Sequence, residues 1–78
     1  MPAWLKLTRP NVEVGGNFVL YQTAIIDLER ASGFAMQNQT SVAFFVDGKA
    51  FVVNQQIDAK SFQSVVAFAQ HATGQSLI

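Results

Sequence analysis

The pair Asp47-Gly48, which lies between two short apolar runs, most narrows what this chain can fold into. Ser41–Val46 precedes the pair and Lys49–Asn54 follows it, and both runs are rich in β-branched and aromatic residues. An Asp-Gly pair in this setting is typical of a two-residue type I′ turn, because both turn positions need a positive φ. The predicted hairpin has a fixed register, which pairs Val46 with Lys49, Phe45 with Ala50, Phe44 with Phe51, Ala43 with Val52 and Val42 with Val53.

Both faces of this predicted hairpin are apolar. Successive side chains of a strand point to opposite faces, so the cross-strand pairs fall into two sets. One face carries Val42, Phe44, Phe51 and Val53, and the other carries Ala43, Phe45, Ala50 and Val52. A single helix covers only one face of a sheet, so the second face needs another sheet layer or another chain.

The segment from Asp58 to Thr73 predicts a helix. Asp58 is a good N-cap residue, and Gly74 is a plausible C-terminal stop. The apolar residues follow the spacing of one helical face. They are Phe62, Val65, Val66, Ala69 and Ala72, with Phe68 widening the stripe.

The N-terminal part of the chain reads as short strands. Trp4–Thr8 predicts a first strand that ends at Pro10, with Leu5 and Leu7 on one face. Asn11–Gly16 predicts a loop or a short hairpin, and Phe18–Tyr21 a further short strand.

The middle of the chain is ambiguous between a strand and a helix. Thr23–Ser32 fits both patterns, and the strand is favoured because its neighbours are strand-like. Ser32–Thr40 is predicted to be a loop because of its Gly, Gln and Asn residues. Residues 1–78 are therefore expected to form one α+β domain, a small antiparallel sheet of four to five strands with one C-terminal helix packed on one face.

The composition argues against an enzyme and against binding of a nucleic acid duplex. The formal net charge is zero, and charged residues make up only 13% of the chain, so no basic field is available for phosphates. There is no Cys and a single His, His71, which is expected in the last helical turn, where a cation is favoured. We assign no catalytic residue, metal site or cofactor.

The low charge and the second apolar hairpin face together predict a homo-oligomer. A chain of this size leaves much apolar area outside its own core, and little charge protects that area from association. The simplest assembly is a two-fold dimer with Phe45 near its centre and Ala43 and Val52 beside it. The Phe45→Glu variant is then expected to give folded monomers.

A small anionic ligand is the alternative partner. Lys6, Arg9 and Arg30 would line an anion site if the first and third strands were neighbours. Three cations suffice for one nucleotide or phosphate, so the alternative function is a binding or sequestering protein of bacterial or phage origin, with a nucleotide-like ligand held between subunits.

No targeting or membrane-spanning segment is expected. The N-terminus lacks a basic region followed by an apolar stretch, and the longest apolar run, Val42–Val46, is far shorter than a spanning helix needs. The absence of Cys fits a reducing compartment, so we expect a cytoplasmic protein with no membrane partner.

Several short motifs occur in the order seen in one bacterial family. They are Leu7-Thr8-Arg9, Ile25–Glu29, Thr40–Val46, Gly48-Lys49, Val52-Val53 and the helix from Asp58 onward. In these motifs and their order the chain resembles the FlbD-type small flagellar proteins, with added residues at Gly33–Gln39. The resemblance implies a cytoplasmic, non-enzymatic accessory protein.

Overall fold

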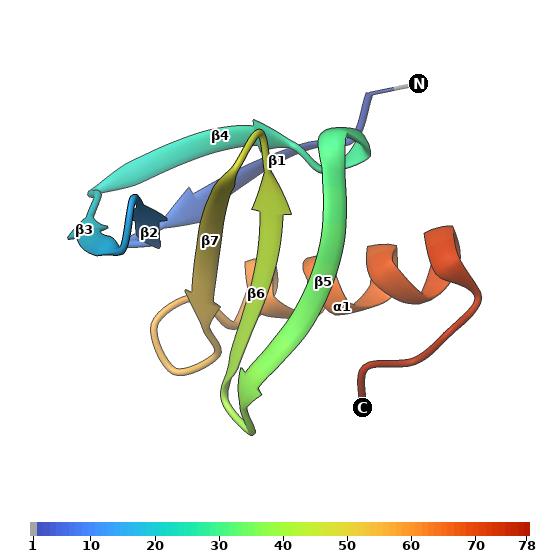
Figure 1. Ribbon diagram of the computed structural model, residues 1–78. Coiled ribbons are helices and arrows are strands. Elements are labelled where there is room, and N and C mark those ends of the chain that lie inside the picture. Colours follow the sequence, from blue (N-terminus) through green and yellow to red (C-terminus); the bar gives the residue numbers. More distant parts are fainter. Residues whose placement is uncertain (1) are drawn as a thin grey trace.

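The computed structural model describes residues 2–78, which form an antiparallel α+β fold (Figure 1). The larger sheet has five strands in the order β3-β2-β7-β6-β5, and β1 pairs with β4 in a separate two-stranded sheet. The predicted fold class is confirmed, with more strands in total than expected. The elements are β1 (Trp4–Thr8), β2 (Asn11–Val14), β3 (Asn17–Leu20), β4 (Thr23–Asp27), a 3-10 helix η1 (Leu28–Arg30), β5 (Ala31–Asn38), β6 (Ser41–Val46), β7 (Lys49–Asn54) and α1 (Ala59–Thr73).

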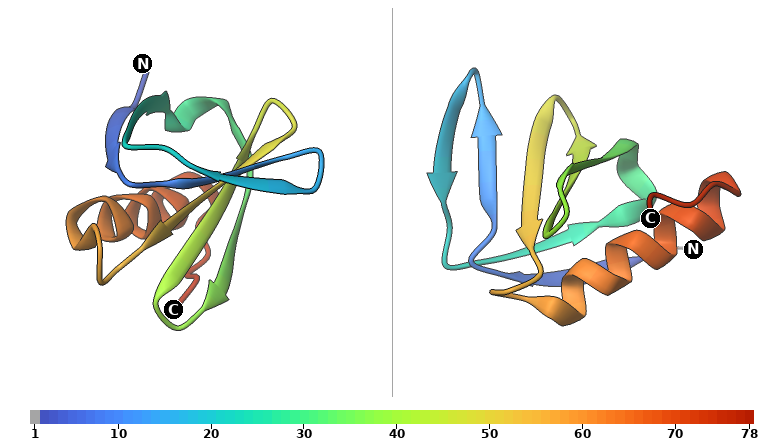
Figure 2. Two further views of the ribbon diagram at one scale, coloured as in Figure 1. Left: turned by 90° about the vertical axis from the view of Figure 1, so that its left-hand side faces the viewer. Right: turned by 90° about the horizontal axis from the view of Figure 1, so that it is seen from below.

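The first four strands form one long, bent hairpin. At the bend, the Arg9 N–H donates to the Gln22 carbonyl and the Tyr21 N–H donates to the Pro10 carbonyl, each at 3.0 Å. These bonds continue the strand pairing from β1–β4 into β2–β3. The outer half, β2–β3, joins the larger sheet through β7, while the inner half, β1–β4, crosses it on the side of α1 (Figure 2).

The β6–β7 hairpin has the predicted turn and register. Asp47 has φ 52° and Gly48 has φ 78°, as a type I′ turn requires. The cross-strand pairs run from Val46 with Lys49 to Val42 with Val53, as expected from the sequence.

The Gly48→Val variant tests this turn. Space is not the obstacle, since a Cβ at Gly48 would meet no atom within 4 Å. The cost comes from the positive φ, which a β-branched residue adopts only with strain, so we expect a loss of about 1–2 kcal/mol or more in unfolding free energy. Chemical denaturation measures it.

Gly33→Ala is the matched control for Gly48→Val. Gly33 has no positive φ, and a Cβ there would lie 3.5 Å from Phe45, an ordinary contact. An equal loss of stability in the two variants would contradict the turn assignment.

The core lies between one face of the larger sheet and a second layer made of α1 and β1–β4. The stripe of α1 packs on the predicted hairpin face, which carries Val42, Phe44 and Val53. The buried members of this cluster are Leu7, Leu28, Val42, Phe44, Val46, Val53, Phe62 and Val65. We call this side of the sheet the helix-side face, and the opposite side the open face.

The N-terminus of α1 is fixed to β1 by two side chains. The Asp58 carboxylate caps the helix by accepting from the Ser61 N–H at 3.2 Å, and it also accepts from the Thr8 N–H at 2.9 Å. The Ser61 hydroxyl donates to the Lys6 carbonyl at 2.8 Å. At the other end, Gly74 adopts the left-handed conformation with φ 73°, so both predicted helix boundaries are confirmed.

Two segment predictions are wrong. The predicted loop Ser32–Thr40 is mostly strand β5, which pairs along β6. The predicted strand Thr23–Ser32 ends at Asp27, whose carboxylate accepts from the Glu29 N–H at 3.0 Å and starts the 3-10 helix. Of the two predictions for Asn11–Gly16, a loop or a short hairpin, the hairpin is correct. Strands β2 and β3 are joined by a turn at Gly15-Gly16.

Candidate interaction surface

The open face of the five-stranded sheet presents large apolar side chains to solvent. Register places Phe45 on this face, and it places Phe18 and Leu20 of β3 there too, through their pairing with β2 and that of β2 with β7. The exposed fractions are 40% for Phe45, 56% for Phe18 and 62% for Leu20. Exposed apolar side chains therefore lie on the edge strand β3 and on β6, with Asn11 and Glu13 of β2 on the same face between them.

Small side chains form the floor between these exposed residues. Ala43, Ala50 and Val52 point to the open face, yet each is only 8% exposed. The two-sided hairpin predicts that these side chains stay exposed in a single chain unless the first strands cover them. Their burial corrects that prediction, because β6 and β7 are central strands with a neighbour on each side. Phe45, the largest of the four predicted residues, is the one that reaches solvent.

Glu13 is the ionisable residue that register places on this face. It lies on β2 between Phe18 and Ala50, and it is half-buried. An isolated carboxylate resists burial without a partner. A partner that covers this face must leave the Glu13 carboxylate at the solvent-exposed edge of the contact or supply a cation that pairs with it.

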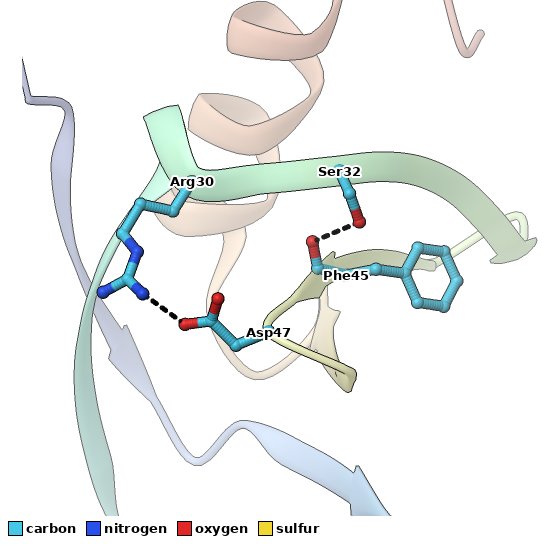
Figure 3. A network of polar contacts seen from close by, with 4 residues as sticks. All are labelled: Arg30, Ser32, Phe45 and Asp47. Atoms are coloured by element: carbon cyan, nitrogen blue, oxygen red, sulfur yellow. Dashed lines mark hydrogen bonds and ion pairs between the residues drawn. The ribbon is translucent and has the colours of Figure 1, made fainter.

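One rim of the face is fixed by polar contacts (Figure 3). Arg30 forms an exposed ion pair with Asp47 at 2.6 Å, which links η1 to the turn of the β6–β7 hairpin. The Ser32 hydroxyl donates to the Phe45 carbonyl at 3.3 Å. These contacts tie the first residues of β5 to the end of β6, beside the exposed Phe45 ring.

The three cations of the predicted anion site lie at separate places. Lys6 is opposite Ile25 in the middle of the β1–β4 pair, and Arg9 is at the bend with a positive φ of 50°. Arg30 is beyond the far end of β4, where it already pairs with Asp47. Leu7 and Thr8 separate Lys6 from Arg9 along the extended chain, so the Cα atoms of the two cations lie about 10 Å apart. The anion site stays a prediction that these placements do not favour.

The single histidine of the chain lies at the end of the helix. His71 is exposed in the last turn of α1, as expected. Residues 2–78 hold no group of three or more His, Asp or Glu side chains that could bind a metal ion. Within the same residues, no helix combines the length and apolar character needed to cross a membrane.

Sequence reasoning missed two contributors to the surface, Phe18 and Leu20. The residues Phe18–Tyr21 predict a short strand, but they do not indicate which strand pairs with it. The signal was Gly15-Gly16, whose tight turn pairs β3 with β2 and so brings both side chains to the open face.

Comparisons of the chain with protein-family models, with curated proteins and with solved structures gave no match.

Proposed function

We propose that this protein is a non-enzymatic interaction or assembly protein that acts as a homo-oligomer through its open sheet face. The observation that carries the proposal is the exposure of Phe18, Leu20 and Phe45 on one face, over a floor of small apolar side chains. Large apolar side chains that several strands expose on one face of a sheet are characteristic of protein interfaces.

A second copy of the chain suits this face for reasons of charge and shape. The face carries one ionisable residue, Glu13, so two copies meet with little like-charge repulsion. Two sheets stack about 10 Å apart, with the side chains of both faces interdigitating. A two-fold contact centred on Phe45 buries the β6–β7 part of the face and leaves Glu13 of β2 toward the edge of the contact.

The Phe45→Glu variant tests the proposal. A carboxylate at this position would be buried without a partner, so we expect the solution mass to fall by half while the circular dichroism spectrum stays unchanged. Light scattering at tens of micromolar protein measures the mass.

Ile25→Glu is the matched control for Phe45→Glu. Ile25 is equally apolar and more exposed, but it lies on β4, outside the larger sheet. Its replacement should leave the mass unchanged. A wild-type chain that is monomeric at this concentration overturns the proposal, and so does a Phe45→Glu variant with the wild-type mass.

The alternative function, binding of a nucleotide-like ligand, has one observation in its favour. Trp4, Arg30 and Lys49 line a cavity of about 180 Å³, which combines an aromatic ring with two cations. The volume is below the roughly 300 Å³ at which small-molecule pockets begin, and Asp27 and Asp47 line it as well. Mass spectrometry of the purified protein under native conditions tests this function by detecting a bound small molecule.

A cytoplasmic location and a bacterial or phage origin belong to the same proposal. The narrower role, as an accessory of the flagellum, rests on the resemblance of the short motifs alone. Fractionation of bacteria that produce the tagged chain tests the location, and recovery of flagellar components with the tagged chain tests the role.

A further inference from the structure

Strand β5 is an edge of the larger sheet with a free side. It runs for eight residues, Ala31–Asn38, and pairs with β6 alone. The two-residue β6–β7 turn makes Val46 and Lys49 a hydrogen-bonded pair, so the alternation directs the backbone groups of Phe45 and Ala43 toward β5. Their partners there are Gly33 and Ala35.

The backbone groups of Phe34 and Met36 consequently point away from β6. Each pairs with β6 at a position without mutual hydrogen bonds, opposite Phe44 and Val42. Among the described residues, no other strand pairs with this side of β5. The two N–H groups and two carbonyls are therefore free to bind another strand.

This edge lacks the charges and prolines that normally prevent strand pairing, and its two irregularities lie on either side of Gly33–Met36. Natural edge strands are protected by charged residues, by proline or by their shortness. The sequence of β5, ASGFAMQN, has none of these. Arg30, which directly precedes β5 in the sequence, forms an ion pair with Asp47.

The apolar layer on the helix-side face also continues up to the edge. Phe34 and Met36 are half-buried and pack against the core. Phe34 and Phe68 line a cavity of about 520 Å³ between β5 and α1. Met36 and Phe62 line a second cavity of about 600 Å³. Leu77 of the C-terminal tail packs against this layer and lines both cavities, so a strand that pairs with the backbone of β5 would lie next to an apolar layer.

We propose that β5 pairs antiparallel with β5 of a second copy, about a two-fold axis at Ala35. This register sets Phe34 opposite the second copy's Met36, so both free positions of each strand find partners. It also keeps the hydrogen-bonded pairs within Phe34–Met36, inside the regular stretch Gly33–Met36 between the two irregularities of β5. Ala35 would face its own copy at a close, non-hydrogen-bonded position, where a small side chain fits.

The choice of a second copy follows from charge. In a two-fold strand pair every side chain lies near a copy of itself or its neighbours, so a charged strand would repel itself. β5 is uncharged along its whole length. The pairing would join the two five-stranded sheets and bring their open faces to the same side, so two such pairs can stack through Phe45 into a closed assembly.

A cysteine at the axis tests this pairing, because the chain has no Cys of its own. Non-hydrogen-bonded partners have Cα atoms about 4.5 Å apart, within the range that a disulfide spans. Under a mild oxidant, we expect Ala35→Cys to give a covalent dimer on a non-reducing gel.

Ser32→Cys is the matched control on the same strand. In the proposed register the two Ser32 positions lie about 20 Å apart, so this variant should stay monomeric on the gel. Absence of a cross-link in folded Ala35→Cys overturns the pairing, and so does equal cross-linking of the two variants.

Hydrogen exchange on the wild-type chain gives a second reading that needs no variant. We expect the Phe34 and Met36 amides to be protected, increasingly so as protein concentration rises. The Phe18 and Leu20 amides point outward from the other edge strand, β3, and serve as the fast-exchanging reference. Exchange of all four amides at the same fast rate overturns the pairing.

The pairing shares with the proposed function only the assumption that the chain self-associates, and the experiments separate the two. If Phe45→Glu halves the mass but Ala35→Cys does not cross-link, the open face acts alone and the edge pairing fails. If Ala35→Cys cross-links while Phe45→Glu keeps the wild-type mass, the edge pairing holds and the role of the open face fails.

Discussion

Replacing Phe44 by alanine is expected to lower the unfolding free energy by about 3–5 kcal/mol, a large part of the total for a small domain. The Phe44 ring is fully buried at the centre of the helix-side face. It stacks on Phe51 with ring centroids 5.4 Å apart and an angle of 8° between the rings. Removal of the ring leaves a cavity that the flanking β-strands cannot close. Urea denaturation measures the loss.

The neighbouring Phe45 supplies the matched control for Phe44→Ala. The two residues have the same chemistry and adjacent positions, but Phe45 is 40% exposed and points to the open face. Phe45→Ala should cost much less within one chain. Because the apparent stability of an oligomer depends on concentration, both variants are compared over the same range of protein concentrations. Equal losses at the lowest concentration would contradict the assignment of the two faces.

Elements with a strong local signal were predictable from the sequence. Asp47-Gly48 determines the turn type, and the turn type determines the register of β6 against β7. Asp58 and Gly74 mark the ends of α1 because each satisfies a backbone requirement at a helix terminus. At these positions the local conformational preference agrees with the tertiary structure, so the sequence alone is enough to predict the turn and the helix ends.

Strand β5 was not predictable in this way. Gly33, Gln37 and Asn38 have low strand propensity, and they suggest a loop. The strand forms because β6 offers hydrogen-bonding partners along most of its length and because Phe34 and Met36, at alternate positions, reach the core. The alternation is visible in the sequence, but it produces a strand only when β6, which follows the next turn, is there to pair with it.

The candidate surface was partly predictable for a related reason. The two-sided hairpin indicated that Phe45 would lie away from the helix, since alternation along a strand is a local rule. The burial of Ala43 and Val52 depends on the strands at either side, β5 and β2, which sequence reasoning did not place there. The contribution of β3 likewise required the β2–β7 pairing, which joins residues far apart in the sequence.

Asp58 connects the helix to the β1–β4 layer, so its loss is expected to have the second-largest effect. The carboxylate accepts hydrogen bonds from Ser61 at the first turn of α1 and from Thr8 at the end of β1. Asp58→Ala removes the helix cap and also leaves the Thr8 N–H to water. We expect a loss of about 1–3 kcal/mol in unfolding free energy, measured by urea denaturation at pH 7.

Asp58→Asn and Arg30→Ala separate the sources of this effect. The Asn side chain keeps one acceptor oxygen but has no charge, so its loss should be smaller than that of Asp58→Ala. Arg30→Ala breaks the exposed ion pair with Asp47, which is worth about 0–1 kcal/mol. An Asp58→Ala variant no less stable than Arg30→Ala would show that the link between α1 and β1 is not needed.

The charge of Asp58 also makes the stability of the fold depend on pH in the acid range. Partial burial acts to raise the pKa of Asp58, but hydrogen bonds from Ser61 and Thr8 and the nearby Lys60 outweigh it and hold the pKa below its usual value of 3.8. A lowered pKa means that the folded state binds the proton less tightly than the unfolded state does. The stabilisation is therefore complete above the unfolded pKa and is lost as the pH falls below it toward the folded pKa.

The stability difference between the wild-type chain and Asp58→Asn should be constant from neutral pH down to about pH 5 and should shrink below about pH 4. A difference that stays constant down to pH 2 would contradict a stabilising role of the charge.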